Sequence, residues 1–323
     1  MRIGIFGYGN LGRGVELAAR NNADAQLVCV FTRRNPGDVQ TQTGIEVRSA
    51  AETDAFREKI DVLIVCAGSS GDVTKLTPLL AERFHVADSF DVHARIPAHY
   101  RAVDRAALRT RHLALISGGW DPGLFSIARL YAAAVMPGGQ CRTFWGPGVS
   151  QGHSEAIRRI PGVLDARAYT IPDSAALDAF RSGEDVSARQ LHTRKCFVAI
   201  EEGADASEIE RAIKRMPGYF EGCETSVEFV CAEELRAAHS ALPHGGLVAC
   251  RGATSLNGQN RVSIETSLRA DSNPEFTGNV LIALARAVYR MSRRGETGAK
   301  TVFDVCPGDL SPMASEALRA EYL

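Results

Sequence analysis

The sequence predicts an α/β protein: a Rossmann-like, doubly wound parallel sheet followed by a second α+β region of mostly antiparallel strands. Apolar runs of strand length alternate with helical stretches through residues 1–120. A glycine-rich turn follows the first of these runs, and the regular alternation stops beyond residue 121. We therefore expect a first domain at 1–120, to which residues 298–323 return, and a second region at 121–297.

The turn Gly7-Tyr8-Gly9-Asn10-Leu11-Gly12 connects an apolar strand at 2–6 to a predicted helix. In the dinucleotide fingerprint Gly7 permits the tight turn, Gly9 lets the backbone approach a pyrophosphate, and Gly12 brings the helix against the strand. The phosphates bind at the helix N-terminus, where backbone N–H groups are free. A plain glycine loop is the alternative, but the strand before and the helix after the turn favour a dinucleotide-binding domain.

The residues after the second strand indicate which dinucleotide. Thr32, Arg33 and Arg34 follow the strand at 26–31, about 20 residues after the turn, where an NAD-binding chain has an acidic residue. A 2′-phosphate needs donors, and arginine presents a planar fork to it. Two charge-assisted bonds of about 1.5–3 kcal/mol each would set a large preference. A solvated pair of surface charges is the alternative; the position favours NADP.

Composition excludes several classes of protein. The chain has 323 residues and a formal net charge of −1, without a basic stripe, so we expect no nucleic-acid partner. No apolar run reaches membrane-spanning length, and Met1 leads directly into a core strand, which argues against a signal peptide. The eight cysteines form no CxxC pair. They predict reduced, buried thiols in a cytoplasmic protein and no zinc or disulfide framework. Cys66 as a nucleophile is an alternative, but a packing role is favoured.

The other elements of the first domain alternate regularly. We expect strands at 61–66, 85–90 and 113–117, a short extended stretch at 45–47, and helices at 51–59, 73–84 and 96–110. Ligands bind beyond the carboxyl ends of such strands. The segments expected at that edge are 7–12, 32–34, 68–70, 89–91 and 117–121.

The second region has a different pattern. We expect an apolar helix at 124–135, a helix capped by Asp205, and strands at 142–145, 166–171, 195–200, 226–230, 246–251 and 261–268. The apolar helix at 276–293 is a candidate subunit interface, and a strand at 301–305 returns to the first domain.

Several polar residues of the second region stand in apolar or glycine-rich surroundings. Each has a structural alternative: core packing for Trp145, loop hydrogen bonds for His153 and His244, a strand-edge charge for Arg194, and a turn before proline for Asn273. Taken singly, the structural alternative is favoured for most of them.

Together, these residues identify a family. The chain resembles meso-diaminopimelate dehydrogenase, an NADP-dependent enzyme of bacterial lysine and cell-wall precursor metabolism, from residue 7 to about residue 274. The matching stretches are Gly7–Arg13, Thr32–Arg34, Trp120–Gly123, Thr143–Gly148, Ser150–Ser154, Arg158–Val163 and Pro243–Gly246.

The resemblance implies a homodimer with dinucleotide, dimerisation and substrate regions. It also implies oxidative deamination of the D-centre of meso-2,6-diaminopimelate to L-2-amino-6-oxopimelate, ammonia and NADPH. The implied cofactor contacts are Tyr8, Gly9, Asn10, Leu11, Thr32, Arg33, Arg34, Cys66, Ala67, Gly68, Ser69, Ser89, Phe90, Asp91, Gly118, Gly119, Trp120, Asp121 and Pro122. The implied substrate contacts are Asp91, Asp121, Trp145, Gln151, Gly152, Thr170, Arg194, His244 and Asn273.

The chemistry of the substrate agrees with these roles. Its two carboxylates need donors such as Arg194, and its ammonium groups need acceptors such as Asp91 and Asp121. One of these aspartates or an ordered water takes the proton that the amine loses; we favour an aspartate. The chain departs from the family pattern at Ser89-Phe90, where Thr-Tyr is frequent, and at Thr32, where Ser is frequent, and 182–190 is a variable stretch that could alter the breadth of the pocket.

Two alternatives stay open at this point. One is an NADP oxidoreductase of broader specificity toward D-amino acids or a semialdehyde. The other is a non-catalytic NADP-sensing protein, which would bind cofactor without turning over any amino acid; the acidic pair Asp91 and Asp121 argues against it.

Overall fold

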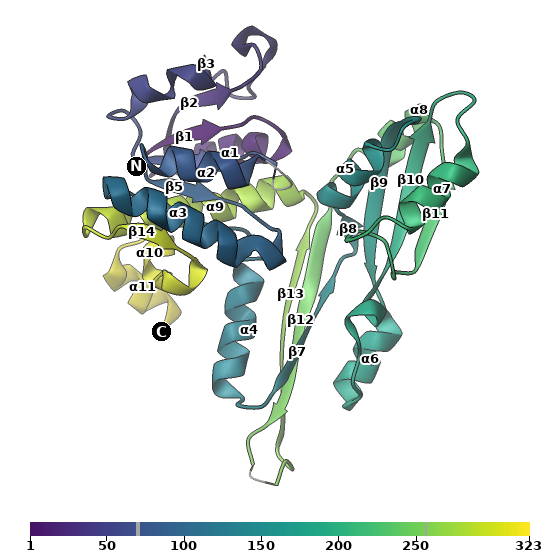
Figure 1. Ribbon diagram of the computed structural model, residues 1–323. Coiled ribbons are helices and arrows are strands. Elements are labelled where there is room, and N and C mark those ends of the chain that lie inside the picture. Colours follow the sequence, from purple (N-terminus) through teal and green to yellow (C-terminus); the bar gives the residue numbers. More distant parts are fainter. Residues whose placement is uncertain (69–71, 256) are drawn as a thin grey trace. The chain divides into compact units, whose positions relative to one another are not determined.

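The computed structural model describes residues 1–68, 72–255 and 257–323. It contains two compact units, one of Met1–Ile127 with Pro274–Leu323 and one of Ala128–Asn273 (Figure 1). The chain returns from the second unit to the first at Pro274, whereas the expected boundary was at residue 297. Helix α9 (Asn273–Arg293) buries Leu281, Ile282 and Leu284 in the core of the parallel sheet, so its residues belong with the first unit.

The first unit contains the predicted parallel sheet. Its seven strands lie in the order β14-β6-β5-β4-β1-β2-β3, and every pairing in it is parallel. The strands are β1 (Arg2–Phe6), β2 (Gln26–Thr32), β3 (Val47–Ser49), β4 (Val62–Val65), β5 (Val86–Asp88), β6 (Leu113–Leu115) and β14 (Gly298–Lys300). Continuous apolar runs such as Val62–Val65 are fully buried because helices cover both faces.

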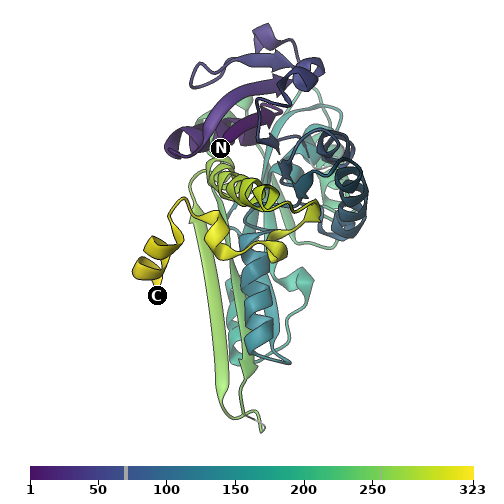
Figure 2. The same cartoon turned by 90° about the vertical axis from the view of Figure 1, so that its left-hand side faces the viewer.

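Two helical layers cover this sheet. One face packs against α1 (Asn10–Asn21) and α9, and the other against α2 (Val73–Ala81) and α3 (Ile96–Thr110). Figure 2 shows the blue α2 and α3 on one side of the sheet and the yellow-green α9 on the other. Where α1 and α9 meet, a Cβ on Gly14 would lie 2.1 Å from the carbonyl oxygen of Pro274, so only glycine permits this approach.

The C-terminal segment returns to the sheet, but not at the expected residues. The edge strand is β14 (Gly298–Lys300), and the expected strand at 301–305 is instead a 3₁₀ turn at Val302–Asp304. The hydroxyl of Thr301 accepts from the backbone N–H of Phe303 and ends the strand. Two short helices follow, α10 (Pro307–Leu310) and α11 (Ser315–Tyr322).

The second unit has two sheets, mostly antiparallel as predicted (Figure 1). One contains β11 (Thr225–Phe229), β10 (His192–Ile200), β9 (Val163–Pro172) and β8 (Gly148–Val149); the other contains β13 (Arg261–Ala270), β12 (His244–Ala253) and β7 (Gln140–Trp145). The parallel exception is β10 with β11. The helices are α5 (Gln151–Arg158), α6 (Ser174–Ser182), α7 (Ala206–Lys214) and α8 (Ala232–Ala238). The side chain of Asp205 caps α7, as predicted, by accepting from the N–H groups of Ser207 and Glu208.

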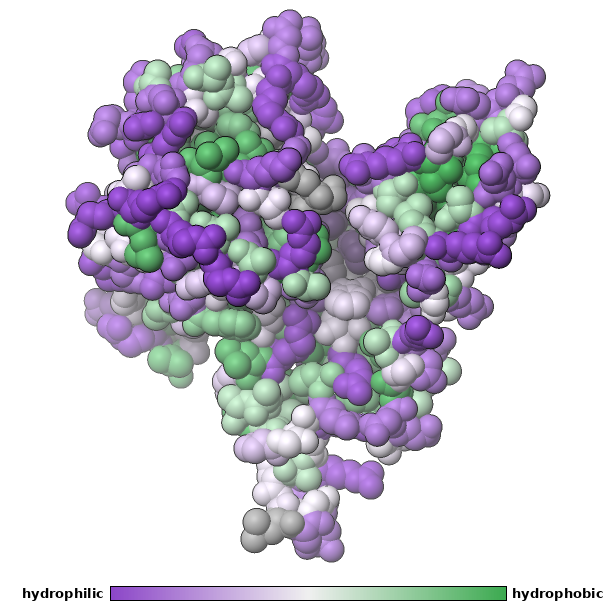
Figure 3. Space-filling model, in the orientation of Figure 1, coloured by the Kyte–Doolittle hydropathy of each residue, from purple (hydrophilic) through white to green (hydrophobic). Residues whose placement is uncertain are grey.

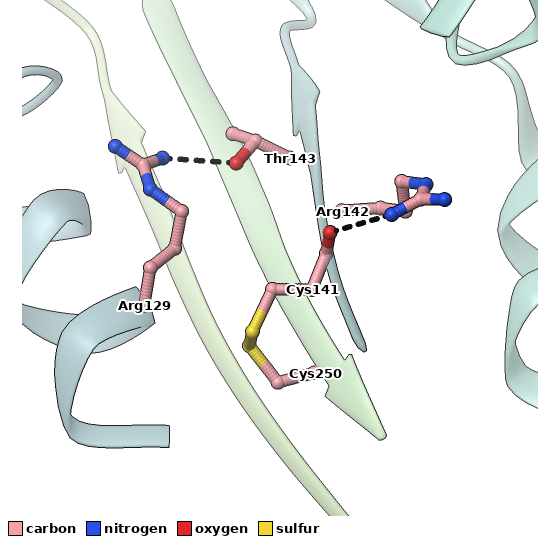
Figure 4. The surroundings of a disulfide bond; sticks show 5 residues. All are labelled: Arg129, Cys141, Arg142, Thr143 and Cys250. Carbon is pink, nitrogen blue, oxygen red and sulfur yellow. Dashed lines mark hydrogen bonds between the residues drawn. A yellow bond between two sulfur atoms is a disulfide. The ribbon is translucent and has the colours of Figure 1, made fainter. Parts of the chain in front are cut away.

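The expectation that all eight cysteines are reduced is wrong for one pair. Cys141 and Cys250 form a disulfide between β7 and β12, at positions that lie directly opposite in the antiparallel ladder (Figure 4). Nearby, Arg129 donates to Oγ1 of Thr143 at 2.9 Å. Spacings along the chain did not indicate the bond, because the two cysteines are 109 residues apart and become neighbours only through strand pairing.

Helix α4 (Leu124–Val135) presents an apolar surface. Tyr131 is 66% exposed and Leu130 51% exposed, and Leu124, Ile127 and Val135 are also exposed; Figure 3 shows apolar surface in the region of α4. By contrast α9, the candidate interface, is buried against the sheet, so that expectation is corrected. Within the described ranges, no helix combines the length and the apolar character needed to cross a lipid bilayer.

Candidate active site

The glycine turn has the geometry that the fingerprint predicts. Gly7 has a φ of +97°, and a Cβ there would lie 2.7 Å from the carbonyl oxygen of Cys66. A Cβ on Gly12 would lie 2.4 Å from the carbonyl oxygen of Gly7, whereas the space around Gly9 is open. Gly9 is the N-cap of α1 and provides no side-chain cap. The first N–H groups of α1 are therefore available to an anion.

A hollow of about 450 Å³ lies at the carboxyl ends of β1, β2 and β4. Eight of the cofactor contacts predicted from the sequence line it, together with Phe6 and Gly7: Tyr8, Gly9, Thr32, Arg33, Arg34, Cys66, Ala67 and Gly68. Asn10 and Leu11 begin α1 next to it, and Ser69 lies outside the described residues. The Tyr8 side chain is buried and its hydroxyl hydrogen-bonds with Glu16, so Tyr8 lines the hollow with its backbone.

Two arginines stand at the end of β2. Arg33 Nη2 forms an ion pair with Oδ2 of Asp72 at 2.5 Å, and Arg34 Nη2 donates to the carbonyl oxygen of Tyr8 at 2.7 Å. Thr32 is buried, and its hydroxyl accepts from the N–H of Arg34 at 3.1 Å. Both arginines line the hollow, and Thr32 shapes the turn that holds them.

Cys66 ends β4 in the same hollow. Burial raises the pKa of its thiol, so the thiolate is disfavoured. This agrees with a packing role and not with a nucleophile.

The ends of β5 and β6 carry the two acidic candidates. Asp91 lies three residues beyond β5 and is exposed, and Asp121 follows β6 in the turn that precedes α4. The remaining predicted cofactor contacts lie in the same two segments: Ser89, Phe90, Gly118, Gly119, Trp120 and Pro122. Phe90 is fully buried against the ring of His99, and Trp120 packs edge-on against Phe125. The side chain of Phe90 therefore faces the interior of the first unit.

In the second unit, Arg194 and Thr170 lie opposite each other on β10 and β9. Arg194 Nη1 donates to Oγ1 of Thr170 at 2.6 Å. The Nε of Arg194 is buried without a hydrogen-bond partner, and Arg194 has no acidic partner in the part of the chain that the structure describes. Burial lowers the pKa of this guanidinium. A partly buried cation without a counter-charge is ready to receive an anion.

Two further predicted substrate contacts, His244 and Trp145, lie close to Arg194 and Thr170. Gly148 pairs with Thr170, and a Cβ on it would lie 2.4 Å from the Cα of His244. Nδ1 of His244 lies 2.8 Å from the N of Gly245 and 3.2 Å from its O. The shorter contact has Nδ1 accepting, so Nε2 carries the proton and is a donor. Trp145 stacks on His192 with ring centroids 5.1 Å apart.

The remaining predicted substrate contacts lie at the N-terminal ends of α5 and α9. Gln151 and Gly152 form the first turn of α5, where the hydroxyl of Ser150 is engaged with His153 and does not cap the helix. The N–H of Asn273 donates to the carbonyl oxygen of Leu242 at 2.8 Å at the start of α9.

Sequence reasoning missed His192 and did not include His153 among the site residues. His153 is hydrogen-bonded to Ser150 and to the carbonyl oxygen of Tyr219 at 3.0 Å. His192 lies two residues before Arg194, on the same face of β10. That spacing was available in the sequence, but the strand was expected to begin at 195.

These histidines predict how stability depends on pH. Burial is the main cause that lowers the pKa of His153, His192 and His244 from 6.5 to about 4. The unfolded chain therefore binds these protons below pH 6.5 while the folded protein does not. We expect the free energy of unfolding to be highest above pH 6.5 and to fall between pH 6.5 and 5, by up to about 1.4 kcal/mol per pH unit per histidine.

Urea denaturation at pH 7.5, 6.0 and 5.0 measures this slope. Replacing His192 with Asn should reduce this slope by the contribution of one histidine, and replacing the exposed His93 with Asn should leave it unchanged. A free energy of unfolding that is constant from pH 7.5 to 5.0 contradicts the prediction.

Comparisons with known proteins identify the family. Residues 119–272 match the diaminopimelic acid dehydrogenase C-terminal domain. The meso-diaminopimelate D-dehydrogenase of Ureibacillus thermosphaericus is 50% identical over 325 residues, covering 100% of this chain and 99% of the relative. The chain belongs to the meso-diaminopimelate D-dehydrogenase family.

Two solved structures are similar to this family member over its whole length. The DAP dehydrogenase of C. glutamicum in complex with DAP has a TM-score of 0.94 at 42% identity and covers 100% of this chain and 99% of its own. An engineered D-amino acid dehydrogenase bound to NADP⁺ has a TM-score of 0.92 at 41% identity, with the same coverage.

Proposed function

We propose that this chain catalyses the reversible, NADP-dependent oxidative deamination of the D-centre of meso-2,6-diaminopimelate, giving L-2-amino-6-oxopimelate, ammonia and NADPH. The observation that carries the proposal is Arg194, whose partly buried charge lacks an acidic partner in the described chain. A substrate carboxylate would supply that partner. Relatives named for this activity at 44–50% identity support the substrate. The role is in lysine and cell-wall precursor metabolism, in the cytoplasm.

The second unit would bind the substrate. Thr170, Arg194 and the Nε2–H of His244 are donors for one carboxylate, and the first turn of α5, at Gln151 and Gly152, adds free N–H groups. In our proposal Trp145 and Asn273 complete the substrate contacts. We propose the second unit, Ala128–Asn273, as the substrate-binding region.

The hollow of the first unit fits NADP. The glycine turn and the open N-terminus of α1 suit a pyrophosphate, and Arg33 and Arg34 suit a 2′-phosphate. The predicted contacts at Cys66–Ser69, Ser89–Asp91 and Gly118–Pro122 would hold the remainder. When bound, NADP⁺ supplies the hydride acceptor; the chain supplies orientation and charge.

Asp91 and Asp121 are the proposed partners of the ammonium group. Oxidation of the amine requires its nitrogen to lose a proton, because the lone pair must be free for the C=N bond to form. A carboxylate within hydrogen-bond reach of that nitrogen accepts such a proton. Water then adds to the iminium and ammonia leaves.

We also propose that the protein is a homodimer. The exposed apolar residues of α4 (Leu124, Ile127, Leu130, Tyr131 and Val135) recur at helical spacing and form an apolar face that another copy could cover. Analytical ultracentrifugation tests this. Wild type should sediment as a dimer, and an L130E/Y131E variant should sediment as a monomer.

Initial rates of NADPH formation with meso-, LL- and DD-diaminopimelate test the activity. We expect turnover of the meso isomer and none of the LL isomer. Equal rates with all three, or none with meso, would reject the assignment. D-alanine and D-phenylalanine probe the broader D-amino acid dehydrogenase, and cofactor binding without turnover of any amino acid would indicate an NADP-sensing protein.

The R33A/R34A double variant tests the cofactor assignment. Losing two charge-assisted donors should raise KM for NADP by about 100-fold or more while KM for NAD changes little. The matched control is R57A/R83A, which removes two surface arginines of the same unit that both pair with Asp54. A double variant that keeps its preference for NADP over NAD contradicts the assignment.

A further inference from the structure

Asp88 and His99 form a hydrogen-bonded pair in the interior of the first unit. Asp88 ends β5 and His99 lies in α3, and their side chains are 0% and 1% exposed. Nε2 of His99 lies 2.6 Å from Oδ2 of Asp88. Neither residue lines the hollow that fits NADP. A pair this deeply buried acts through the residues that it holds.

Asp88 holds two segments of the chain at once. Its Oδ1 accepts from the N–H of Phe90 at 3.1 Å and from the N–H of Ser117 at 2.8 Å. Its main-chain oxygen accepts from the N–H of Gly118 at 2.7 Å. A buried N–H that loses its acceptor costs about 1–3 kcal/mol. One residue therefore fixes the backbone after β5 and the backbone after β6.

Ser117 has a backbone conformation that needs such support. Its φ is +57°, in the left-handed region that L residues other than glycine adopt at a cost of about 1–2 kcal/mol. Asp88 supports this conformation by accepting hydrogen bonds from the N–H groups of Ser117 and Gly118. Because Asp121 follows three residues after Gly118, the direction in which the chain leaves Ser117 sets where its carboxyl group lies.

His99 restrains the other segment as well. Its ring packs on the ring of Phe90, with centroids 4.5 Å apart, and Phe90 is fully buried. The next residue is Asp91. His99 thus holds Asp88 by a hydrogen bond and Phe90 by packing.

We propose that Asp88 and His99 are positioning residues that set the places of the Asp91 and Asp121 carboxyl groups for the reaction. The inference rests on the proposed function, which gives those two aspartates their roles. Neither positioning residue has to touch the substrate, because a displacement of about 1 Å at a reacting group can lower a rate by about 100-fold.

Paired substitutions test the proposal. D88A and H99L remove the contacts, whereas D88N keeps an oxygen for the two N–H groups and H99Q keeps a donor for Asp88. We expect D88A and H99L to lower kcat with meso-diaminopimelate by about 10- to 100-fold. The Kd for NADP should change much less, because the glycine turn, Arg33 and Arg34 are untouched. D88N and H99Q should restore most of kcat. The control is D104A, which removes the acceptor of the Ala299 N–H elsewhere on α3; it should leave kcat unchanged.

A double-mutant comparison and hydrogen exchange complete the test. In a D121N background, D88A should lower kcat by much less than in wild type, since the group that it positions is already lost. Amide exchange in segments 89–91 and 117–121 should rise in D88A and H99L but not in D104A. Full additivity with D121N, an equal loss of kcat in D104A, or unchanged exchange overturns the proposal. If wild type does not oxidise meso-diaminopimelate, the proposed function fails, and the exchange result still decides whether Asp88 and His99 position these segments.

Discussion

Replacing the aspartate that accepts the proton, Asp121 or Asp91, with Asn is expected to lower kcat for meso-diaminopimelate oxidation by about 10²- to 10⁴-fold. Both residues follow neighbouring parallel strands, since β5 pairs with β6, so their segments leave the sheet at one edge. Asparagine keeps the shape of the side chain but neither attracts an ammonium group nor takes its proton. Initial rates of NADPH formation over a range of substrate concentrations measure the loss.

The split between kcat and KM separates the two aspartates. The variant that lacks the proton acceptor should lose kcat, and the other should keep most of kcat and show mainly a higher KM for meso-diaminopimelate. The control is D178N, which changes an exposed aspartate of α6 in the other unit. If D91N and D121N both keep more than about half of the wild-type kcat, an ordered water is the acceptor and the aspartates only hold the amine.

Periodicity and strand ends predicted the parallel sheet because both are local signals. The five inner strands of the sheet are short, mostly apolar runs, unlike the edge strands β3 and β14, and the turn at Gly7 occurs where β1 meets a helix. The partner of α9 was not predictable in this way. Its apolar face indicates burial but not what buries it, and the decisive contact is Gly14 against Pro274, 260 positions apart in the chain. The Cys141–Cys250 bond was missed for the same reason.

The site was predictable to the level of segments but not of side-chain direction. The rule that ligands bind at the carboxyl ends of parallel strands selects Thr32–Arg34 and Cys66–Gly68, and both stretches line the hollow. The same rule cannot tell that Tyr8 turns to Glu16 or that Phe90 turns to His99. Those directions depend on Glu16 of α1 and His99 of α3, buried polar residues whose placement follows from how each helix packs on the sheet.

Replacing Arg194 with Met is expected to lower kcat/KM for meso-diaminopimelate while leaving the fold as stable as before, or more stable. Losing one member of a buried, hydrogen-bonded charge pair costs about 2–5 kcal/mol, or roughly 30- to 4,000-fold in kcat/KM. The unliganded protein loses much less, because among the described residues the guanidinium of Arg194 bonds only to Thr170 and carries its charge at partial burial. An apolar side chain of similar length removes that cost.

Activity and thermal unfolding therefore move independently in this variant, which distinguishes a ligand-binding arginine from a structural one. Lys195→Met is the matched control: the neighbouring residue on β10 faces the other way and pairs with Glu228 at 3.1 Å, so kcat/KM should not change. R194K should recover only part of the activity, because an ammonium group lacks the planar fork that binds a carboxylate with two bonds. If R194M keeps the wild-type kcat/KM, or if its Tm falls along with the activity, Arg194 is a structural residue and the carboxylate site must lie elsewhere.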